Sequence, residues 1–456
     1  MIVGGVIPPD EGQGQMSSTV VTAIDTPDPR NLRRTAQGAW TLYDFANTIF
    51  SFAIVSGAMG QWLIIEHGEQ LGQAVFGFTI LASIGLNALV SPMLGVLADR
   101  GGRRLPFLLV FTALCVGPTA FIGISGPAAG ALLFIVANFS YQAALIYYDS
   151  SIKLVSTPAT RGRLSGIGTG IGYCGTVFVA LLIQFGQIPV EARFALAAVL
   201  YGLFAIPVFV VLREPHRHGP PVTRRDLAGA LAQLPRTWRH AGEVPGLRRF
   251  LVGRFFYSDA VNTVIVVMTL VATAAVGFTS LQANLILLAL TLVAIAMSFV
   301  WGALVDRFGP RRTLIAVLLS WAVGLVIGGL SLSLNGTGPD GKPVPETAGI
   351  ALFIIAGAIL GSGLGGVQVT DRVFMVRLSP PERVGEFFGV YGLVGKASQL
   401  VGQALYTIII VTLVGSLGIV AYQIALLSLI VTMLIGLWLV APVDDRWAGS
   451  GEVAAA

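Results

Sequence analysis

The residues best suited to chemistry form one polar pattern that occurs twice in the chain. In each copy an aspartate is followed three and four positions later by an asparagine and a threonine, so the three side chains share one face of a helix. The copies are Asp44, Asn47, Thr48 and, 215 positions later, Asp259, Asn262, Thr263. Such acids could bind a polar solute or carry a coupling proton. Alternatively, each acid pairs with a base or accepts hydrogen bonds from a neighbouring helix.

A double arginine precedes each aspartate by ten residues. Arg33-Arg34 and Arg248-Arg249 open long apolar stretches. At about 1.5 Å per helical residue, each aspartate lies roughly 15 Å from its arginines, near the middle of an apolar layer about 30 Å thick. An acid at that depth costs on the order of 2.5–3.5 kcal/mol, so two symmetric acids require a functional or a paired role.

Two bases lie in the same kind of apolar stretch. Lys396 has no counterpart in the first half of the chain, and we expect it to bind an anionic group or to pair with Asp44 or Asp259. A zwitterionic solute would use both signs, with its ammonium at the acids and its carboxylate at Lys396. Arg254 follows the second double arginine closely, so it either reaches the site or extends back to the membrane surface.

Polar side chains of a further apolar segment complete the candidate set. Asn138 and Gln142 share one helix face and either line a cavity or join two helices by hydrogen bonds. The candidate substrate- or proton-binding residues are Asp44, Asn47, Asp259, Asn262, Lys396, Asn138, Gln142, Tyr43 and Tyr257. We expect no catalytic residue, metal or cofactor, because the sequence has no Walker loop, metal-ligand cluster or nucleophile-base set. A proton is the candidate coupling ion.

Membrane-spanning helices must position these residues. Of 456 residues, 55% are hydrophobic and 11% charged, against roughly 25% charged in soluble domains. Each of twelve apolar segments has about the 20 residues that a spanning helix needs. They cover residues 36–65, 73–98, 105–125, 129–150, 164–187, 193–212, 250–275, 281–301, 313–333, 348–370, 386–412 and 417–440. The composition predicts an all-α integral membrane protein of twelve transmembrane helices, embedded in a lipid bilayer.

The basic residues predict orientation rather than a nucleic-acid partner. The formal net charge is +5, but the arginines stand between apolar segments and form no single patch. They gather in alternate connections, which places both termini in the cytoplasm of a multi-pass plasma (inner) membrane protein. Cys115 and Cys174 lie in apolar stretches and are expected to be packed thiols.

The long basic connection in the middle divides the chain into two halves. We expect a disordered cytoplasmic leader at 1–35, an N-terminal six-helix half at 36–212, a cytoplasmic linker at 213–248, a C-terminal six-helix half at 249–441 and a cytoplasmic tail at 442–456. In the linker, Leu227, Leu231, Leu234 and Trp238 recur at helical spacing. The linker therefore contains either an amphipathic helix at the membrane surface or a solvated basic segment.

Two further repeats relate helix n to helix n+6. The loop residues Gly95, Asp99 and Arg100 recur as Gly302, Asp306 and Arg307, and Asp149, Pro158 and Arg161 recur as Asp371, Pro380 and Arg383. Three such matches predict parallel duplicated halves. The loop aspartates could latch the cytoplasmic side by meeting arginines or a helix N-terminus, or the loops could serve only as topological anchors. The candidate gating residues are Asp99, Arg100, Arg103, Asp306, Arg307, Asp149, Arg161, Asp371 and Arg383.

These motifs resemble those of a known group of transporters. The loops Gly95-Val-Leu-Ala-Asp99-Arg100 and Gly302-Ala-Leu-Val-Asp306-Arg307 resemble the signature loop of the major facilitator superfamily. The stretches Trp40-Thr-Leu-Tyr43-Asp44-Phe-Ala-Asn47, Arg254-Phe-Phe-Tyr257-Ser-Asp259 and Tyr391-Gly-Leu-Val-Gly395-Lys396 resemble the fungal vacuolar amino-acid effluxers related to autophagy and their bacterial relatives. The resemblance spans about 36–440 and implies a major facilitator fold of two parallel six-helix halves.

The resemblance implies a monomeric secondary transporter and no enzyme. The expected substrate is a small polar or zwitterionic molecule, foremost an amino acid, exported by alternating access with proton coupling as an option. The alternatives are efflux of another small amphipathic compound or drug, and a membrane sensor that keeps the fold without transporting.

Overall fold

The computed structural model describes residues 27–100, 103–214, 234–337 and 343–444. Within these ranges twelve helices are long and apolar enough to cross a membrane, which confirms the predicted all-α membrane fold. The first six spans are α2 (Arg34–Phe50) with η1 (Ser51–Ala58) and α3 (Met59–His67), α4 (Glu69–Arg100), α5 (Leu105–Ile122), α6 (Pro127–Ser150) followed by the short α7 (Ile152–Val155), α8 (Arg161–Phe185) and α9 (Val190–Val211).

The second six spans follow the helix α11 (Leu234–Glu243). They are α12 (Leu247–Leu270) with η3 (Val271–Val276), α13 (Ser280–Phe308), α14 (Pro310–Ser333), α15 (Thr347–Leu378), α16 (Val384–Leu417) preceded by η4 (Pro381–Arg383), and α17 (Ile419–Val440). Two short antiparallel strands, β1 (Gly336–Thr337) and β2 (Pro343–Val344), lie between α14 and α15.

The first spans of the two halves share an irregularity. Both α2 and α12 continue beyond their aspartate as π-helix, in η1 and η3. A π-helical turn widens the helix and is frequent at functional sites. The duplication therefore extends from the polar residues to the backbone that follows them.

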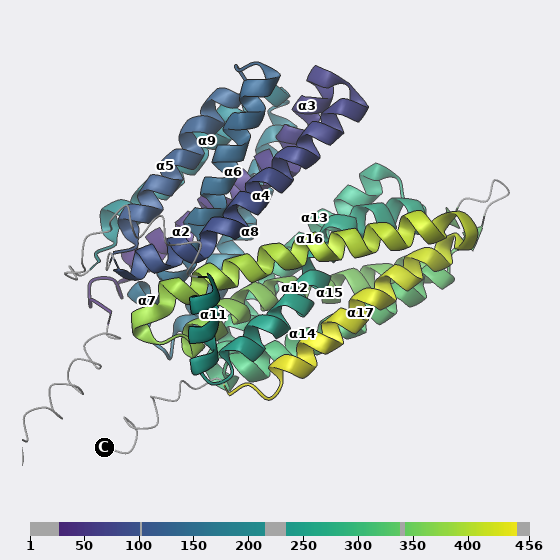
Figure 1. Ribbon diagram of the computed structural model, residues 1–456. Helices are drawn as coiled ribbons and strands as arrows, with labels where there is room; N and C mark the ends of the chain where they lie inside the picture. Colours follow the sequence, from purple (N-terminus) through teal and green to yellow (C-terminus); the bar gives the residue numbers. More distant parts are fainter. Residues whose placement is uncertain (1–26, 101–102, 215–233, 338–342, 445–456) are drawn as a thin grey trace, which may run out of the picture.

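Among the described residues, the two halves pack against each other mainly at one end of the bundle. In Figure 1 their ribbons converge where α7 and α11 lie and diverge toward α3. The helices that join them are α4 with α16, α8 with α13 and α15, and α6 with α16. Close approach depends on glycines: a Cβ at Gly95 of α4 would overlap the carbonyl oxygen of Gly385, and one at Gly166 of α8 would overlap that of Ser298. We call this end, which holds Arg104, Arg163, Arg312 and Arg377, the arginine-rich end.

One predicted helix boundary is wrong in a way that matters. The apolar pattern predicts that the tenth segment ends at residue 370, but α15 continues to Leu378 because Val373, Phe374, Met375 and Val376 are apolar and buried. Asp371 and Arg372 therefore lie inside a membrane helix and not in a loop.

Part of the predicted domain plan falls outside the described residues. In the linker the structure describes α11 from Leu234, whereas Leu227 and Leu231 lie outside the described residues. The same holds for most of the predicted leader and for the tail beyond residue 444.

Candidate functional site

A single arginine of the C-terminal half reaches two acids of the N-terminal half. Arg372 Nε on α15 lies 3.0 Å from Asp149 Oδ1 on α6, and its Nη2 lies 3.5 Å from Asp44 Oδ2 on α2. Only 7% of Arg372 is exposed, so the three charges are shielded from solvent. This cluster, which we call the cross-half bridge, joins the halves just inside the arginine-rich end.

Two aromatic rings hold the guanidinium of Arg372 in place. Its Cζ lies 5.4 Å from the ring centroids of both Trp40 and Tyr148, a cation–π distance. The two rings stack at 4.6 Å, and the Trp40 indole donates to Ser151 Oγ. The N-terminal half thus surrounds one side chain of the other half with two aromatic rings and two acids.

A second charged group lies wholly within the C-terminal half. Asp371 accepts hydrogen bonds from Arg254 Nε at 2.7 Å, Tyr257 Oη at 2.5 Å and Tyr391 Oη at 3.0 Å. Arg254 also lies over the Tyr391 ring, 3.5 Å from its centroid. Arg254 therefore reaches the site, and the alternative that it extends to the membrane surface is wrong.

Lys396 lies beside these pairs without joining them. It has no hydrogen-bond or ion-pair partner within the described part of the chain, although the charges of Arg254 and Asp149 act on it. The expected pairing with Asp44 is wrong because Arg372 occupies that acid. Asp259, the other expected partner, forms no ion pair among the described residues.

The two duplicated aspartates occupy equivalent places with unequal partners. Asp44 packs against Gly168 and Gly172 of α8, and Thr48 Oγ1 donates to the Gly172 carbonyl oxygen. Asp259 packs in the same way against Gly402 of α16, but its Oδ1 has no hydrogen-bond partner. Asp44 is therefore paired with Arg372, whereas Asp259 is a buried carboxyl group with one unpaired oxygen.

The other predicted binding residues divide between the cluster and the packing around it. Tyr257 belongs to the second charged group, because its hydroxyl donates to Asp371. Tyr43 does not: it is fully buried and its hydroxyl contacts Thr112 and Tyr201.

The amide side chains give a similar division. Asn138 donates to Ser83 of α4 at 2.7 Å, which joins two helices of one half. Asn47 and Gln142 are buried, each with an unpaired carbonyl oxygen, and Asn262 is partly exposed.

The loop aspartates meet helix N-termini of the opposite half. Asp99 accepts from the backbone N–H groups of Gly385 and Glu386 at 2.8 and 2.7 Å, and Asp306 accepts from those of Gly162 and Arg163 at 2.7 and 2.9 Å. Carboxylates are favoured at helix N-termini because the unpaired N–H groups and the helix dipole attract negative charge. Both contacts close the arginine-rich end, and we call them the latches.

The first latch also contains a charged side chain. Arg104 Nη2 lies 3.6 Å from Asp99 Oδ1. Burial raises the pKa of the Asp99 carboxyl group above its usual range, and Arg104 and the two backbone donors oppose that shift.

The remaining gating candidates have other surroundings. Asp371 and Arg383, both gating candidates, do not meet: Asp371 is bound by Arg254 and two tyrosines, and Arg383 lies 3.6 Å from Glu243. Arg161 is buried and directs its Nε to Ser156. The guanidinium of Arg307 lies over the Phe308 ring. Arg103 is partly exposed, and the side chain of Arg100 lies outside the described part of the chain.

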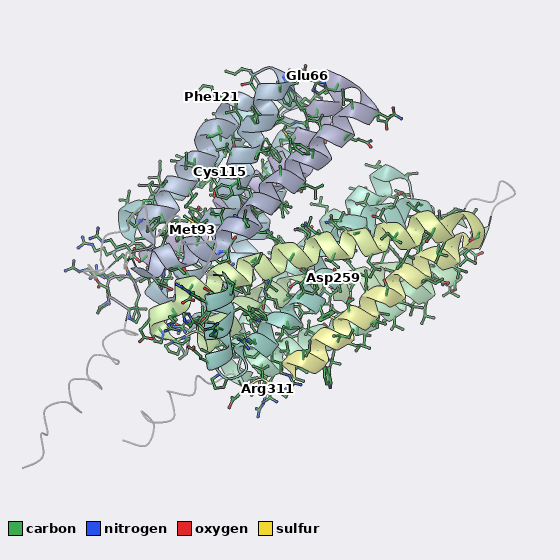
Figure 2. The ribbon with its side chains drawn as sticks, in the orientation of Figure 1. Glu66, Met93, Cys115, Phe121, Asp259 and Arg311 are labelled. Carbon is green, nitrogen blue, oxygen red and sulfur yellow. The ribbon has the colours of Figure 1, made fainter. Side chains whose placement is uncertain are left out.

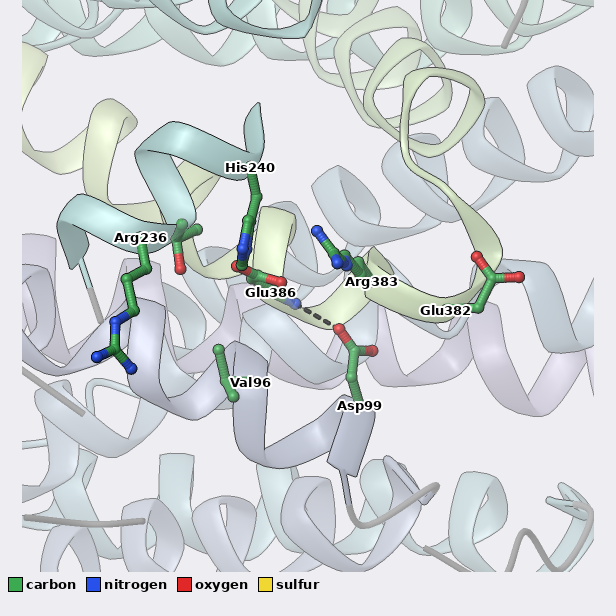
Figure 3. A pocket seen from close by; sticks show the side chains of 8 residues that line it. Val96, Asp99, Arg236, His240, Glu382, Arg383 and Glu386 are labelled. Atoms are coloured by element: carbon green, nitrogen blue, oxygen red, sulfur yellow. Dashed lines mark hydrogen bonds and ion pairs between the residues drawn. The ribbon is translucent and has the colours of Figure 1, made fainter. Parts of the chain in front are cut away.

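The helix α11 covers the first latch. A cavity of about 320 Å³ lies between α11, the end of α4 and the start of α16, and Figure 3 shows side chains that line it. Across the cavity, His240 Nδ1 of α11 lies 3.0 Å from Glu386 Oε1. Glu386 is also one of the two residues whose backbone N–H groups donate to Asp99. The linker between the halves is thereby attached to the segment that must move when the latch opens.

Sequence reasoning missed the residue at the centre of the site. By its spacing Arg372 resembles a loop arginine. Trp40 and Tyr391 belong to the family motifs, but nothing in the sequence shows that they contact an arginine, and Tyr148 belongs to no motif. The apolar run that follows Asp371-Arg372 was the available signal, because a pair of charges flanked by apolar residues on both sides lies within a helix rather than at its end.

Two halves of six helices, a buried charge cluster between them and latches at one end define a secondary transporter of the major facilitator class. The human organic anion transporter MFSD10 (TETRAN) has a similar fold, with a TM-score of 0.67 at 16% identity over 91% of this chain and all of that one. The chain belongs to the family described as "Vacuole effluxer Atg22 like", which matches residues 153–446.

Curated relatives agree with this assignment. The MFS-type transporter YxiO of Bacillus subtilis (strain 168) is 25% identical over 439 residues, covering 90% of this chain and 95% of that protein. Autophagy-related protein 22 of Neurospora crassa is 24% identical over 78% of this chain, which spans 60% of that longer protein. These similarities support a transporter and identify no substrate.

Proposed function

We propose that this protein exports a small polar or zwitterionic solute, an amino acid in the first place, by alternating access coupled to protons. The structure has the arginine-rich end closed. Transport then requires the cross-half bridge and both latches to break as the halves rock about the site.

The observation that best supports this proposal is the distribution of charged side chains at the site. Asp44 and Asp149 share Arg372, so that side has an excess of negative charge. Lys396 forms no ion pair among the described residues and lies within reach of the charges of both Arg254 and Asp149, so its ammonium is available to the carboxylate of a solute. A solute with an ammonium and a carboxylate would satisfy both sides at once, whereas a neutral solute would satisfy neither.

The proposed orientation in the membrane and the proposed direction of transport are supported by different observations. The arginines at the closed end favour placing that end and both termini in the cytoplasm of the plasma membrane. The family description names an effluxer, which supports export.

The test is transport by the purified full chain in liposomes. We would measure uptake and counterflow of radiolabelled amino acids, dipeptides and small carboxylates, each with and without an imposed pH gradient. Saturable movement of amino acids that the gradient accelerates supports the proposal. Movement of simple carboxylates alone would favour an organic anion as substrate, and the absence of any substrate would favour the sensor alternative.

Replacing Lys396 by glutamine is expected to raise KM for carboxylate-bearing substrates by roughly 10- to 100-fold, the loss of one charge-assisted contact. Lys396→Arg keeps the charge and should retain most of the affinity. For substrate analogues with a carboxamide in place of the carboxylate, Lys396→Gln should change KM little. An unchanged KM for carboxylates in Lys396→Gln would remove the proposed anchor.

Replacing Asp259 by asparagine is expected to uncouple transport from the pH gradient. Asp259 as a whole residue is 3% exposed and forms no ion pair among the described residues, so its carboxyl group can take up and release a proton without breaking one. Counterflow, which needs no gradient, should persist, while accumulation driven by the gradient is lost. A variant that still accumulates substrate like the wild type would assign the proton elsewhere.

A further inference from the structure

Four side chains of the N-terminal half surround the guanidinium group of Arg372. Trp40 and Tyr148 place ring centroids 5.4 Å from its Cζ, and Asp44 and Asp149 place carboxylate oxygens 3.5 and 3.0 Å from its nitrogens. Proteins bind organic cations between aromatic ring faces in this way, and acids beside the rings add charge attraction. We call Trp40, Tyr148, Asp44 and Asp149 the cation cage.

The cation cage is held together by contacts inside the N-terminal half. The Trp40 indole donates to Ser151 Oγ at 3.0 Å, and Tyr148 Oη donates to the Trp40 carbonyl oxygen at 3.2 Å. The Tyr43 ring stacks on the Tyr148 ring with centroids 4.9 Å apart. Because Arg372 takes part in none of these contacts, we expect the two rings of the cage to keep their places when the halves separate.

Arg372 is an imperfect ligand for the cation cage. Its Nη2 reaches Asp44 only at 3.5 Å, the outer limit of a hydrogen bond. Its Nε, although close to Asp149, makes no hydrogen bond among the described residues, and neither does its Nη1. The position of this guanidinium is limited by its own helix, α15. The guanidinium of a free solute has no such tether and can direct its N–H groups at both acids.

Opening of the arginine-rich end takes the cation out of the cage. Arg372 moves away with α15, and Asp44 and Asp149 lose the cation that pairs with both. Buried carboxylates without a counter-ion are unfavourable. A cationic solute that arrives from the open end replaces the lost partner, and the return of Arg372 on closure displaces that solute again.

The C-terminal half has no second cage at the equivalent positions, all of which the structure describes. Figure 2 shows Asp259, the counterpart of Asp44, among the helices of that half. Thr370, which has no ring, stands where the repeat has Tyr148. Asp371 is already bound by an arginine of its own half. The cation of a solute therefore has one aromatic site, in the N-terminal half.

We propose that the cation cage binds the cationic group of the transported solute once the arginine-rich end opens, and that this group is a guanidinium. The inference rests on the proposed function and narrows the solute to one that carries a guanidinium and a carboxylate. A guanidinium is planar and weakly hydrated, so it lies against aromatic rings more readily than an ammonium does. Lys396 lies within reach of the charge of Asp149, so the carboxylate of the same solute can bind there.

The first test measures the selectivity of transport by the purified full chain in liposomes. Counterflow of arginine, lysine, citrulline and alanine is compared, because citrulline has nearly the shape of arginine without its charge. KM for arginine is expected to be roughly tenfold lower than KM for lysine, and lower still relative to citrulline. Tyr148→Leu should bring the KM values of arginine and lysine within about twofold of each other, whereas Tyr148→Phe keeps the ring and the preference. Phe111→Leu, which removes a ring stacked on Tyr147 in the same half, is the control and should also keep the preference.

The second test does not depend on transport. Arg372→Ala empties the cage, and electron–electron distances across the arginine-rich end are measured with methylguanidinium or methylammonium added at the same millimolar concentrations. Methylguanidinium is expected to fill the cage and shorten these distances toward the wild-type value, whereas methylammonium should need roughly tenfold higher concentrations. In Tyr148→Leu/Arg372→Ala neither cation should shorten them.

The two tests separate this inference from the proposed function. Equal KM values for arginine and lysine, or an arginine preference that survives in Tyr148→Leu, would overturn the assignment of the cage. Transport of alanine with no preference for arginine and no effect of methylguanidinium would remove the inference and leave the proposed function standing. Closure by methylguanidinium without transport of any amino acid would support the cage and count against the proposed function. If Arg372→Ala does not fold, the transport measurements decide, because they use no Arg372 variant.

Discussion

Replacing Arg372 by glutamine is expected to reduce transport by roughly 100-fold or more. Arg372 is the only cation within ion-pair distance of Asp44 and Asp149 among the described residues, and all three side chains are largely buried. Removing one partner of a buried pair costs about 3–5 kcal/mol, because the remaining charge stays desolvated without compensation. Here two carboxylates lose the same partner. The closed arrangement of the arginine-rich end loses stability, and the cycle loses one of its two end states.

Arg254→Gln is the matched control for this effect. Arg254 is a similarly buried arginine, but its partner Asp371 lies in the same half, so its loss should leave the distance between the halves unchanged. Arg372→Lys keeps the charge without the planar fork and should be intermediate. The double variant Asp149→Asn/Arg372→Gln should recover part of the closed state. Normal transport by a folded Arg372→Gln protein, or an equal opening in Arg254→Gln, would contradict the bridging role.

The helices and the duplication could be predicted from the sequence, because both depend on local patterns. Apolar runs and arginine-rich connections define the spans, and the repeated glycine and aspartate of the loops indicated that Asp99 and Asp306 could meet arginines or a helix N-terminus. The sequence did not predict which groups these aspartates bind, because a carboxylate can accept hydrogen bonds from a helix N-terminus as well as from an arginine. In the structure both bind backbone N–H groups.

The partners at the site could not be predicted, because they depend on packing between distant segments. Asp44 and Arg372 are 328 positions apart, and nothing near either residue specifies the other. The surroundings of Tyr43 could not be predicted from its sequence neighbours either. It is next to Asp44 in sequence, but neighbours on a helix point about 100° apart, and that turn directs the tyrosine into the core of its own half.

The symmetry of the sequence also concealed an asymmetry of charge. Each half contributes two acids to the site, Asp44 and Asp149 from one and Asp259 and Asp371 from the other. The cations Arg254, Arg372 and Lys396 all come from the C-terminal half. Duplication therefore explains the acids, and the placement of the cations in one half explains why one acid bridges the halves while its counterpart stays unpaired.

Replacing Gly95 by alanine is expected to open the arginine-rich end. A Cβ at this position would overlap the Gly385 carbonyl oxygen, and its next contact is backbone as well, so no flexible side chain can move away. The helices α4 and α16 must then separate one turn before Asp99 reaches the N–H groups of Gly385 and Glu386. Overpacking of this kind costs about 1–3 kcal/mol, which shifts the balance of the two states by roughly 5- to 150-fold.

Gly85→Ala is the control, because it lies on the same helix and a Cβ there meets nothing within 4 Å. Distances across the arginine-rich end should lengthen in Gly95→Ala and stay at the wild-type value in Gly85→Ala. Asp99→Asn weakens the same latch without adding bulk, so it should lengthen the distances in the same direction. If Gly95→Ala stays closed while Asp99→Asn opens, the latch depends on charge alone. If neither variant opens, the contact between α4 and α16 does not hold the halves together, and the cross-half bridge through Arg372 would have to do so.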